Sequence, residues 1–190
     1  MEVVGLTGNI GSGKSTIAKA FVALGIPVFN SDDEAKKAYA IPSIQNEVKA
    51  TLGIEIDFSK DSWKSEIASI IFSNVEKRLR LEKLIHSYVQ DKFTQWKSKQ
   101  TSKYIIREAA LADSFHPENC DWLIEVDANR ETRLQRVILR SGLTEEEFNK
   151  RDSLQKRNEK FPSNKLFKIE NNEGNRILND ILVIHEKLNA

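Results

Sequence analysis

The feature that most constrains this chain is a glycine-rich stretch near its start, GNIGSGKS at residues 8–15. Its spacing matches G-x-x-x-x-G-K-[ST], the pattern of a phosphate-binding loop. Glycine suits such a loop because backbone N–H groups can close around phosphate oxygens without a Cβ in the way. An apolar run at residues 2–6 precedes the loop, and an amphipathic segment at 14–24 follows it. This order of strand, loop and helix predicts a site for a nucleoside triphosphate and argues against a chance glycine-rich turn.

Two side chains of the loop have predicted chemical roles. Lys14 would place its positive charge on the β- and γ-phosphates, and the Ser15 hydroxyl would hold Mg²⁺. The helix that starts near Gly13 would add the positive end of its dipole to the anion site. The expected nucleotide contacts in the loop are Gly8, Asn9, Ile10, Gly11, Ser12, Gly13, Lys14, Ser15 and Thr16.

The composition narrows the possible partners and compartments. A formal net charge of +1 over 190 residues gives no electrostatic reason to expect nucleic acid or an anionic membrane as a partner. The single cysteine, Cys120, excludes an internal disulfide and suits a reducing compartment. The three histidines are too far apart in sequence to suggest a metal site. With no signal-peptide pattern and no apolar run of membrane length, we expect a cytoplasmic protein. We also favour a monomer.

Short apolar runs alternate with amphipathic segments over most of the chain. Strands are expected at residues 2–6, 26–29, 104–106, 122–126 and 166–169. Helices are expected at 14–24, 31–39 and 129–140, from Thr144 onward with a Thr144–Glu147 capping box, and near the C-terminus through Leu188. Such alternation predicts a three-layer α/β/α sandwich around a mostly parallel sheet.

The segment between residues 43 and 99 breaks this alternation. Its apolar positions recur with a period of 3.6 residues, and it contains no convincing buried strand. A helical block between the strands of an α/β protein predicts an inserted subdomain. We therefore expect a nucleotide-binding core at 1–40 and 101–190 and a helical insertion at 41–100 that covers a second substrate.

Asp32 directly follows the second expected strand. Ligands of parallel α/β sheets bind at the carboxyl ends of the strands, so Asp32 and the phosphate-binding loop should share one edge. A carboxylate there could accept a proton from an acceptor hydroxyl or hold a water on Mg²⁺. Alternatively, Asp32 is an acid at a helix start that complements the helix dipole, and its position alone leaves both interpretations open. For the neighbouring Asp33 we favour the dipole role.

Four arginines, Arg130, Arg133, Arg136 and Arg140, share one helical face. Arginines commonly neutralise the charge that phosphoryl transfer spreads over the transferred group. For Arg136 and Arg140, which lie nearest the break at Gly142, we favour a role at the phosphates. For Arg130 and Arg133 we favour a solvated, salt-bridged face. The N-K-x-D match at residues 149–152 lies inside a charged helix, and no D-x-x-G occurs in the chain, so we interpret it as chance.

Several ordered motifs together resemble the dephospho-CoA kinase family along essentially the whole chain. The residues GLTGNIGSGKST at 5–16 are similar to the family's G-L-T-G-G-I-G-S-G-K-S-T, and LGIPVFNSD at 24–32 to L-G-x-x-V-I-D-A-D. Residues 71–72 and 84–86 fall on the family's V-F and L-x-H-P elements. Residues 135–146, 151–155 and 169–174 are similar to Q-R-x-x-x-R-x-x-L-T-x-E, R-x-x-x-Q and I-x-N-x-G. One phosphate-binding loop is unspecific, but the ordered set is specific.

The resemblance implies an adenylate-kinase-like P-loop fold with a five-stranded parallel sheet, a CoA-binding helical insertion and a lid at about 136–158. It implies transfer of the ATP γ-phosphoryl group to the ribose 3′-hydroxyl of dephospho-CoA, the last step of coenzyme A synthesis, with Mg²⁺. Asp32 falls on the family's base and Arg140 on a lid arginine. His86, Lys64 and Asp113, with Asp32, would line the acceptor site. The segment from Asn171 to Gly174, which includes Asn172, would lie near the adenine of ATP, and Arg140 would lie near its phosphates.

Three departures from the family pattern concern the acceptor site. Asn30 replaces the first aspartate of D-A-D, Ser87 replaces the proline after the histidine, and Asp113 replaces a glutamate. Two alternatives stay open. One is another P-loop kinase of nucleotides or metabolites, because acceptor choice depends on pocket shape. The other is a nucleotide-binding regulator that is not a kinase, against which the missing D-x-x-G and the arginine helix argue.

Overall fold

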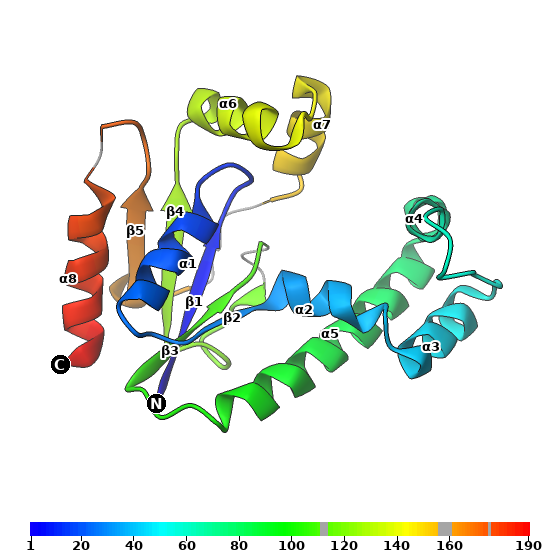
Figure 1. Cartoon of the computed structure of the whole chain (residues 1–190), viewed down its shortest axis with the longest axis horizontal. Helices are drawn as coiled ribbons and strands as arrows, with labels where there is room; N and C mark the ends of the chain where they lie inside the picture. Colours follow the sequence, from blue (N-terminus) through cyan, green and yellow to red (C-terminus); the bar gives the residue numbers. More distant parts are fainter. Residues whose placement is uncertain (111–113, 156–160, 175) are drawn as a thin grey trace. The chain divides into compact units, whose positions relative to one another are not determined.

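Five parallel strands form one sheet within the part of the chain that the structure, a computed structural model, describes (Figure 1). The described residues are 1–110, 114–155, 161–174 and 176–190. The strands are β1 (Glu2–Gly8), β2 (Val28–Asn30), β3 (Tyr104–Glu108), β4 (Trp122–Asp127) and β5 (Leu166–Glu170), in the order β2-β3-β1-β4-β5. The expected parallel α/β sheet is confirmed.

The central strand, β1, owes its position to a continuous apolar sequence. Val3, Val4 and Leu6 are almost fully buried, as expected for a parallel strand with both faces covered. Leu6 pairs with Glu108 of β3 on one side, and Gly8 pairs with Val126 of β4 on the other. The carboxyl ends of β1, β3 and β4 therefore meet at one edge of the sheet, where the glycine-rich loop begins.

The sheet belongs to a compact unit formed by Met1–Asn30 and Gln100–Ala190. Its helices are α1 (Lys14–Ala23), α6 (Arg130–Ser141), α7 (Glu145–Asp152), α8 (Ile177–Asn189) and the short 3₁₀ helix η2 (Ser163–Lys165). Ile17 and Phe21 of α1 and Ile184 of α8 are buried in the core cluster on one face of the sheet. Thr144 and Glu147 form the expected capping box at the start of α7.

A second compact unit, Ser31–Lys99, is entirely helical. It contains α2 (Ser31–Ala38), α3 (Pro42–Leu52), α4 (Trp63–Ser73) and α5 (Val75–Lys97). The other three helices pack against α5, whose buried side chains Leu81, Ile85, Val89 and Phe93 recur every fourth residue. The helical character expected between residues 43 and 99 is confirmed, and α2 adds residues 31–38 to the unit.

In the described part of the chain, no helix combines the length and the apolar character needed to cross a lipid bilayer.

Candidate active site

The glycine-rich loop connects the end of β1 to the start of α1. Gly11 and Gly13 have φ angles of 80° and 95°, a backbone conformation that other L-residues rarely adopt. A Cβ on Gly11 would lie 2.4 Å from the carbonyl oxygen of Arg133, and a Cβ on Gly13 would lie 2.1 Å from the Asn171 side-chain nitrogen. Both positions therefore require glycine, for the backbone angle and for the close approach.

The side chains that should meet phosphate lie at the mouth of this loop. The Lys14 ammonium donates a hydrogen bond to the carbonyl oxygen of Gly8 at 2.6 Å, which holds it across the loop. Ser15, in the first turn of α1, has an exposed side chain. The first turn of α1 contains no acidic residue, so nothing there offsets the positive end of the helix dipole. The loop is thus arranged to receive an anion.

Asn171, just after β5, stabilises the loop through hydrogen bonds although it is distant in sequence. Its side-chain amide donates to the carbonyl oxygen of Ser12 at 2.8 Å, and its backbone N–H donates to the carbonyl oxygen of Asp127 at 2.7 Å. Asn172 accepts a hydrogen bond from the backbone N–H of Asn129 at 2.8 Å, at the start of α6. The predicted adenine-side residues Asn172 and Gly174 thus follow a residue that itself supports the loop.

The arginines of α6 differ in burial. Arg130 is half exposed and pairs with Glu145 at 2.6 Å, as expected for a salt-bridged face. Arg133 is only 7% exposed and donates to the carbonyl oxygen of Ile10, so the expectation of a solvated side chain was wrong. The physical reason is that position 133 faces the loop and the end of α7, where its guanidinium pairs with Asp152.

The two arginines for which a phosphate role is expected lie further along the same helix. Arg136 approaches the carbonyl oxygen of Gly11 with a nitrogen–oxygen distance of 3.5 Å. Arg140 lies in the last turn of α6 with an exposed side chain, just before the C-cap at Gly142. Of these two arginines, Arg136 therefore lies at the loop and Arg140 is exposed near the end of the helix.

Two residues at the carboxyl edge of the sheet were missed by the sequence analysis as a pair. Asn30 ends β2, Glu108 ends β3, and the Asn30 side-chain amide donates to the Glu108 carboxylate at 3.0 Å. Glu108 is 5% exposed and is in register with Leu6 of the strand that leads into the phosphate-binding loop. An acidic residue at the end of a buried strand was the available signal.

Three of the four predicted acceptor residues lie in the helical unit. Asp32 is half-buried in the first turn of α2, and His86 is exposed on α5. Lys64 is exposed on α4, with its ammonium 5.5 Å from the centre of the Trp63 ring. The fourth, Asp113, lies outside the described residues.

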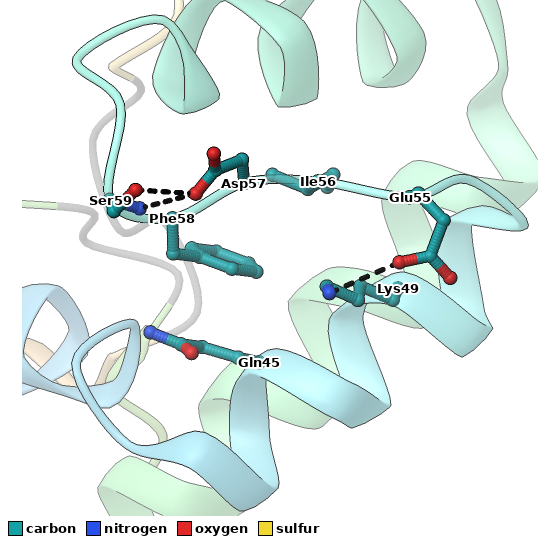
Figure 2. Close-up of a pocket in the computed structure, with 7 residues that line it drawn as sticks. All are labelled: Gln45, Lys49, Glu55, Ile56, Asp57, Phe58 and Ser59. Atoms are coloured by element: carbon teal, nitrogen blue, oxygen red, sulfur yellow. Dashed lines mark hydrogen bonds and ion pairs between the residues drawn. The ribbon is translucent and has the colours of Figure 1, made fainter.

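The helical unit also contains a hollow of about 630 Å³ (Figure 2). Its lining residues are Gln45, Lys49, Glu55, Ile56, Asp57, Phe58 and Ser59. The Lys49 ammonium is paired with Glu55 at 3.1 Å, and Asp57 accepts hydrogen bonds from the backbone and hydroxyl of Ser59. Because the carboxylates outnumber the lysine, this hollow offers no net positive charge to a phosphorylated ligand.

A phosphate-binding loop between the central strand of a β2-β3-β1-β4-β5 parallel sheet and the next helix defines a P-loop nucleotide-binding protein. A family model described as dephospho-CoA kinase matches residues 2–176. A dephospho-CoA kinase from Fusobacterium nucleatum is 33% identical over 174 residues, covering 90% of this chain and 90% of that protein. The chain belongs to the dephospho-CoA kinase family, and the resemblance noted in the sequence is confirmed.

A further relative agrees with this assignment, and two solved structures share the fold. A dephospho-CoA kinase from Porphyromonas gingivalis is 31% identical over 159 residues, covering 83% of this chain and 79% of that protein. The crystal structure of TT1252 from Thermus thermophilus superposes with a TM-score of 0.86 at 27% identity, covering 100% of this chain and 98% of that one. Dephospho-CoA kinase from Campylobacter jejuni gives a TM-score of 0.60 at 19% identity, covers 98% and 96%, and supports the fold.

Proposed function

We propose that this protein transfers the γ-phosphoryl group of ATP to the ribose 3′-hydroxyl of dephospho-CoA. The observation that carries the proposal is the formed phosphate-binding loop, with Lys14 held across it, in a chain of the dephospho-CoA kinase family. Charge on the transferred phosphoryl group is the main catalytic problem in such a reaction, and positioned cations are its usual solution. Lys14 and the α1 dipole supply that positive field in the loop.

The acceptor hydroxyl needs a proton acceptor, and Asp32 is our candidate base. It is half-buried in the first turn of α2, at the start of the helical unit that we propose as the acceptor-binding part of the chain. His86 and Lys64, on α5 and α4 of the same unit, and Asp113 are proposed acceptor contacts. Arg136 and Arg140 are proposed phosphate contacts of a lid at about 136–158, and Asn172 and Gly174 are proposed adenine-side contacts.

A divalent cation fits the side chains present near the loop. The structure offers the exposed Ser15 hydroxyl in the first turn of α1 and the buried Glu108 carboxylate at the end of the strand next to β1. Hydroxyl and carboxylate oxygens are the ligands that Mg²⁺ accepts in kinase sites, often through water. We propose that Ser15 holds Mg²⁺ and that Glu108 holds its water shell. The ion would neutralise charge on the β- and γ-phosphates.

We further propose that the protein acts in the cytoplasm and needs only ATP and dephospho-CoA as partners. A nearly neutral chain gives no electrostatic support for nucleic acid or an anionic membrane surface as a partner. We favour a monomer.

The decisive experiment measures ADP release from Mg-ATP with and without dephospho-CoA, with wild-type protein and Asp32→Asn in parallel. Stimulation by dephospho-CoA that collapses in Asp32→Asn, while ATP binding persists, supports both the acceptor and the base. Equal stimulation in both proteins would retain the acceptor and remove Asp32 as the base. No stimulation in the wild type would overturn the acceptor, and a panel of nucleosides and small metabolites would then test the alternative of another P-loop kinase.

A further inference from the structure

The phosphate-binding loop is also held from the α6–α7 side, by a pair of charged residues that the proposed chemistry does not use. Arg133 lies on α6 and Asp152 is the last residue of α7. Their side chains form an ion pair with two contacts, 2.5 Å and 3.2 Å, and the Arg133 side chain is 8% exposed. The Asp152 side chain is 21% exposed, and a largely buried pair with two contacts holds a more fixed geometry than a surface ion pair.

Both members of the pair also contact the loop. Arg133 donates to the carbonyl oxygen of Ile10 at 3.3 Å, and the Asp152 carboxylate accepts from the Asn9 side-chain amide at 3.4 Å. Three residues further on, the Gln155 side chain accepts from the backbone N–H of Ile10 at 2.6 Å. The N–H and C=O groups of one loop residue, Ile10, are thus both bound by side chains from this region.

The geometry also links the pair to the rest of the unit. The Arg133 side chain donates to the carbonyl oxygen of Ala128 at 3.0 Å, which ties it to the segment between β4 and α6. A Cβ on Gly11 would lie only 2.4 Å from the backbone carbonyl oxygen of Arg133, so α6 packs directly against the loop. A displaced guanidinium would therefore change the loop's backbone support and not only a surface charge.

We propose that the Arg133–Asp152 pair positions the phosphate-binding loop for the nucleotide. The pair fixes the backbone of residues 9–11, so that the loop is preformed for phosphate. Nucleotide affinity therefore depends on the position of the C-terminal end of α7. Neither residue needs to touch the nucleotide. The inference rests on the proposed nucleotide site, but it does not depend on which acceptor is phosphorylated.

The chain offers a matched control on the same helix. Arg130 also pairs across to α7, with Glu145 at 2.6 Å and Asn149 at 2.7 Å. Its guanidinium lies 5.7 Å from the Phe148 ring centre, against 5.5 Å for Arg133. Arg133 is buried and donates to the loop backbone at Ile10, whereas Arg130 is half exposed and pairs with α7. Arg130→Met therefore removes a comparable α6–α7 contact and leaves the loop support in place.

The test compares ADP binding by titration calorimetry for the wild type, Arg133→Met and Arg130→Met. We expect Arg133→Met to weaken ADP binding by about 10- to 100-fold, because small misplacements of binding groups cost that much. Arg130→Met should stay within about 2-fold, as expected for an exposed pair. In steady-state kinetics, Arg133→Met should raise the KM for ATP and leave the KM for the acceptor unchanged, which general destabilisation would not do.

Two milder variants keep the test decisive if Arg133→Met does not fold. Asp152→Asn preserves shape and removes the charge, and Arg133→Lys preserves the charge and loses the two-contact geometry. Both variants should weaken ADP binding. The double variant should lose less ADP affinity than the sum of the losses in the two single variants. Folded variants that bind ADP as tightly as the wild type would overturn the inference. Wild-type protein that binds ADP without phosphorylating dephospho-CoA would instead overturn the proposed acceptor alone.

Discussion

The Asn30 side-chain amide donates a 3.0 Å hydrogen bond to the buried carboxylate of Glu108 across the neighbouring ends of β2 and β3. The family pattern has an aspartate where this chain has Asn30. In this chain the neighbouring negative charge is the carboxylate of Glu108. The acid therefore lies on the strand adjacent to β1, and Asn30 orients it. This arrangement leads to two predictions.

Glu108→Gln should reduce turnover by about 100-fold, because the proposed Mg²⁺ water shell would lose a charged partner and the ion would neutralise phosphoryl charge less well. ADP binding measured without metal should be unchanged, because the loop and Lys14 are intact. The check is a Mg²⁺ titration of activity, in which the variant should need more Mg²⁺ for half-maximal rate. An unchanged Mg²⁺ dependence would remove Glu108 from the proposed metal site.

Asn30→Asp should destabilise the protein by about 1–3 kcal/mol near pH 8, because it replaces a hydrogen-bond donor with a second carboxylate beside a buried one. The two neighbouring carboxylates would raise the pKa of one of them in the folded state, so the folded protein would keep a proton that the unfolded chain has released. The stability of the variant therefore falls as the pH rises. Urea unfolding at pH 8 and pH 5.5 should show a smaller difference from the wild type at the lower pH. A difference independent of pH would contradict the repulsion between the two groups.

Gly13→Ala should abolish measurable nucleotide binding. The substitution forces a side chain into a φ of 95° and places its Cβ 2.1 Å from the Asn171 side-chain nitrogen. Gly25→Ala is the matched control: Gly25 has a φ of 81° and no described neighbour within 4 Å. Both variants should lose about 1–2 kcal/mol from backbone strain, but Gly25→Ala should bind ADP normally. Calorimetry on the two proteins separates strain from loop geometry.

The sheet and the loop could be predicted from the sequence because their signals are local. Apolar runs such as residues 2–6 specify buried strands, and the glycine-lysine-serine spacing specifies a phosphate-binding loop whatever the rest of the chain does. The helical unit could also be predicted, since the buried apolar positions of α5 recur every fourth residue from Leu81 to Phe93. The acceptor substrate was predicted from the family motifs, because local sequence patterns do not specify it.

The supports of the site could not be predicted because they join residues far apart in sequence. No local sequence pattern marks Arg133 as buried. Arg130 is also an arginine on the same face of the same helix, and the two differ in burial only because of where α7 and the loop lie. Asn171 reaches Ser12 across 159 positions, and Asp152 reaches Asn9 across 143. Such contacts follow from how α6, the end of α7 and the segment after β5 approach the loop that follows β1, rather than from any periodic pattern.

Cys120 provides a final prediction that depends on burial alone. Burial raises the pKa of its thiol to about 12, against an ordinary value of 9.0, although the Gly5 N–H donates to the sulfur at 3.0 Å. Because the folded pKa is the higher one, the folded protein keeps the thiol neutral while the unfolded chain ionises it. Stability is therefore lost as the pH rises from about 9 towards 12, by up to about 1.4 kcal/mol per pH unit.

The measurement is urea unfolding of the wild type and Cys120→Ala at pH 8, 9.5 and 10.5. The wild type should lose more stability than the variant over this range, and the difference isolates the thiol because buried Tyr104, whose pKa is also raised by burial, is present in both proteins. A thiol reagent at pH 8 provides the control, since it should modify Cys120 only after unfolding. Parallel pH profiles of the two proteins, or rapid modification of the folded wild type, would show that the thiol ionises in the native state.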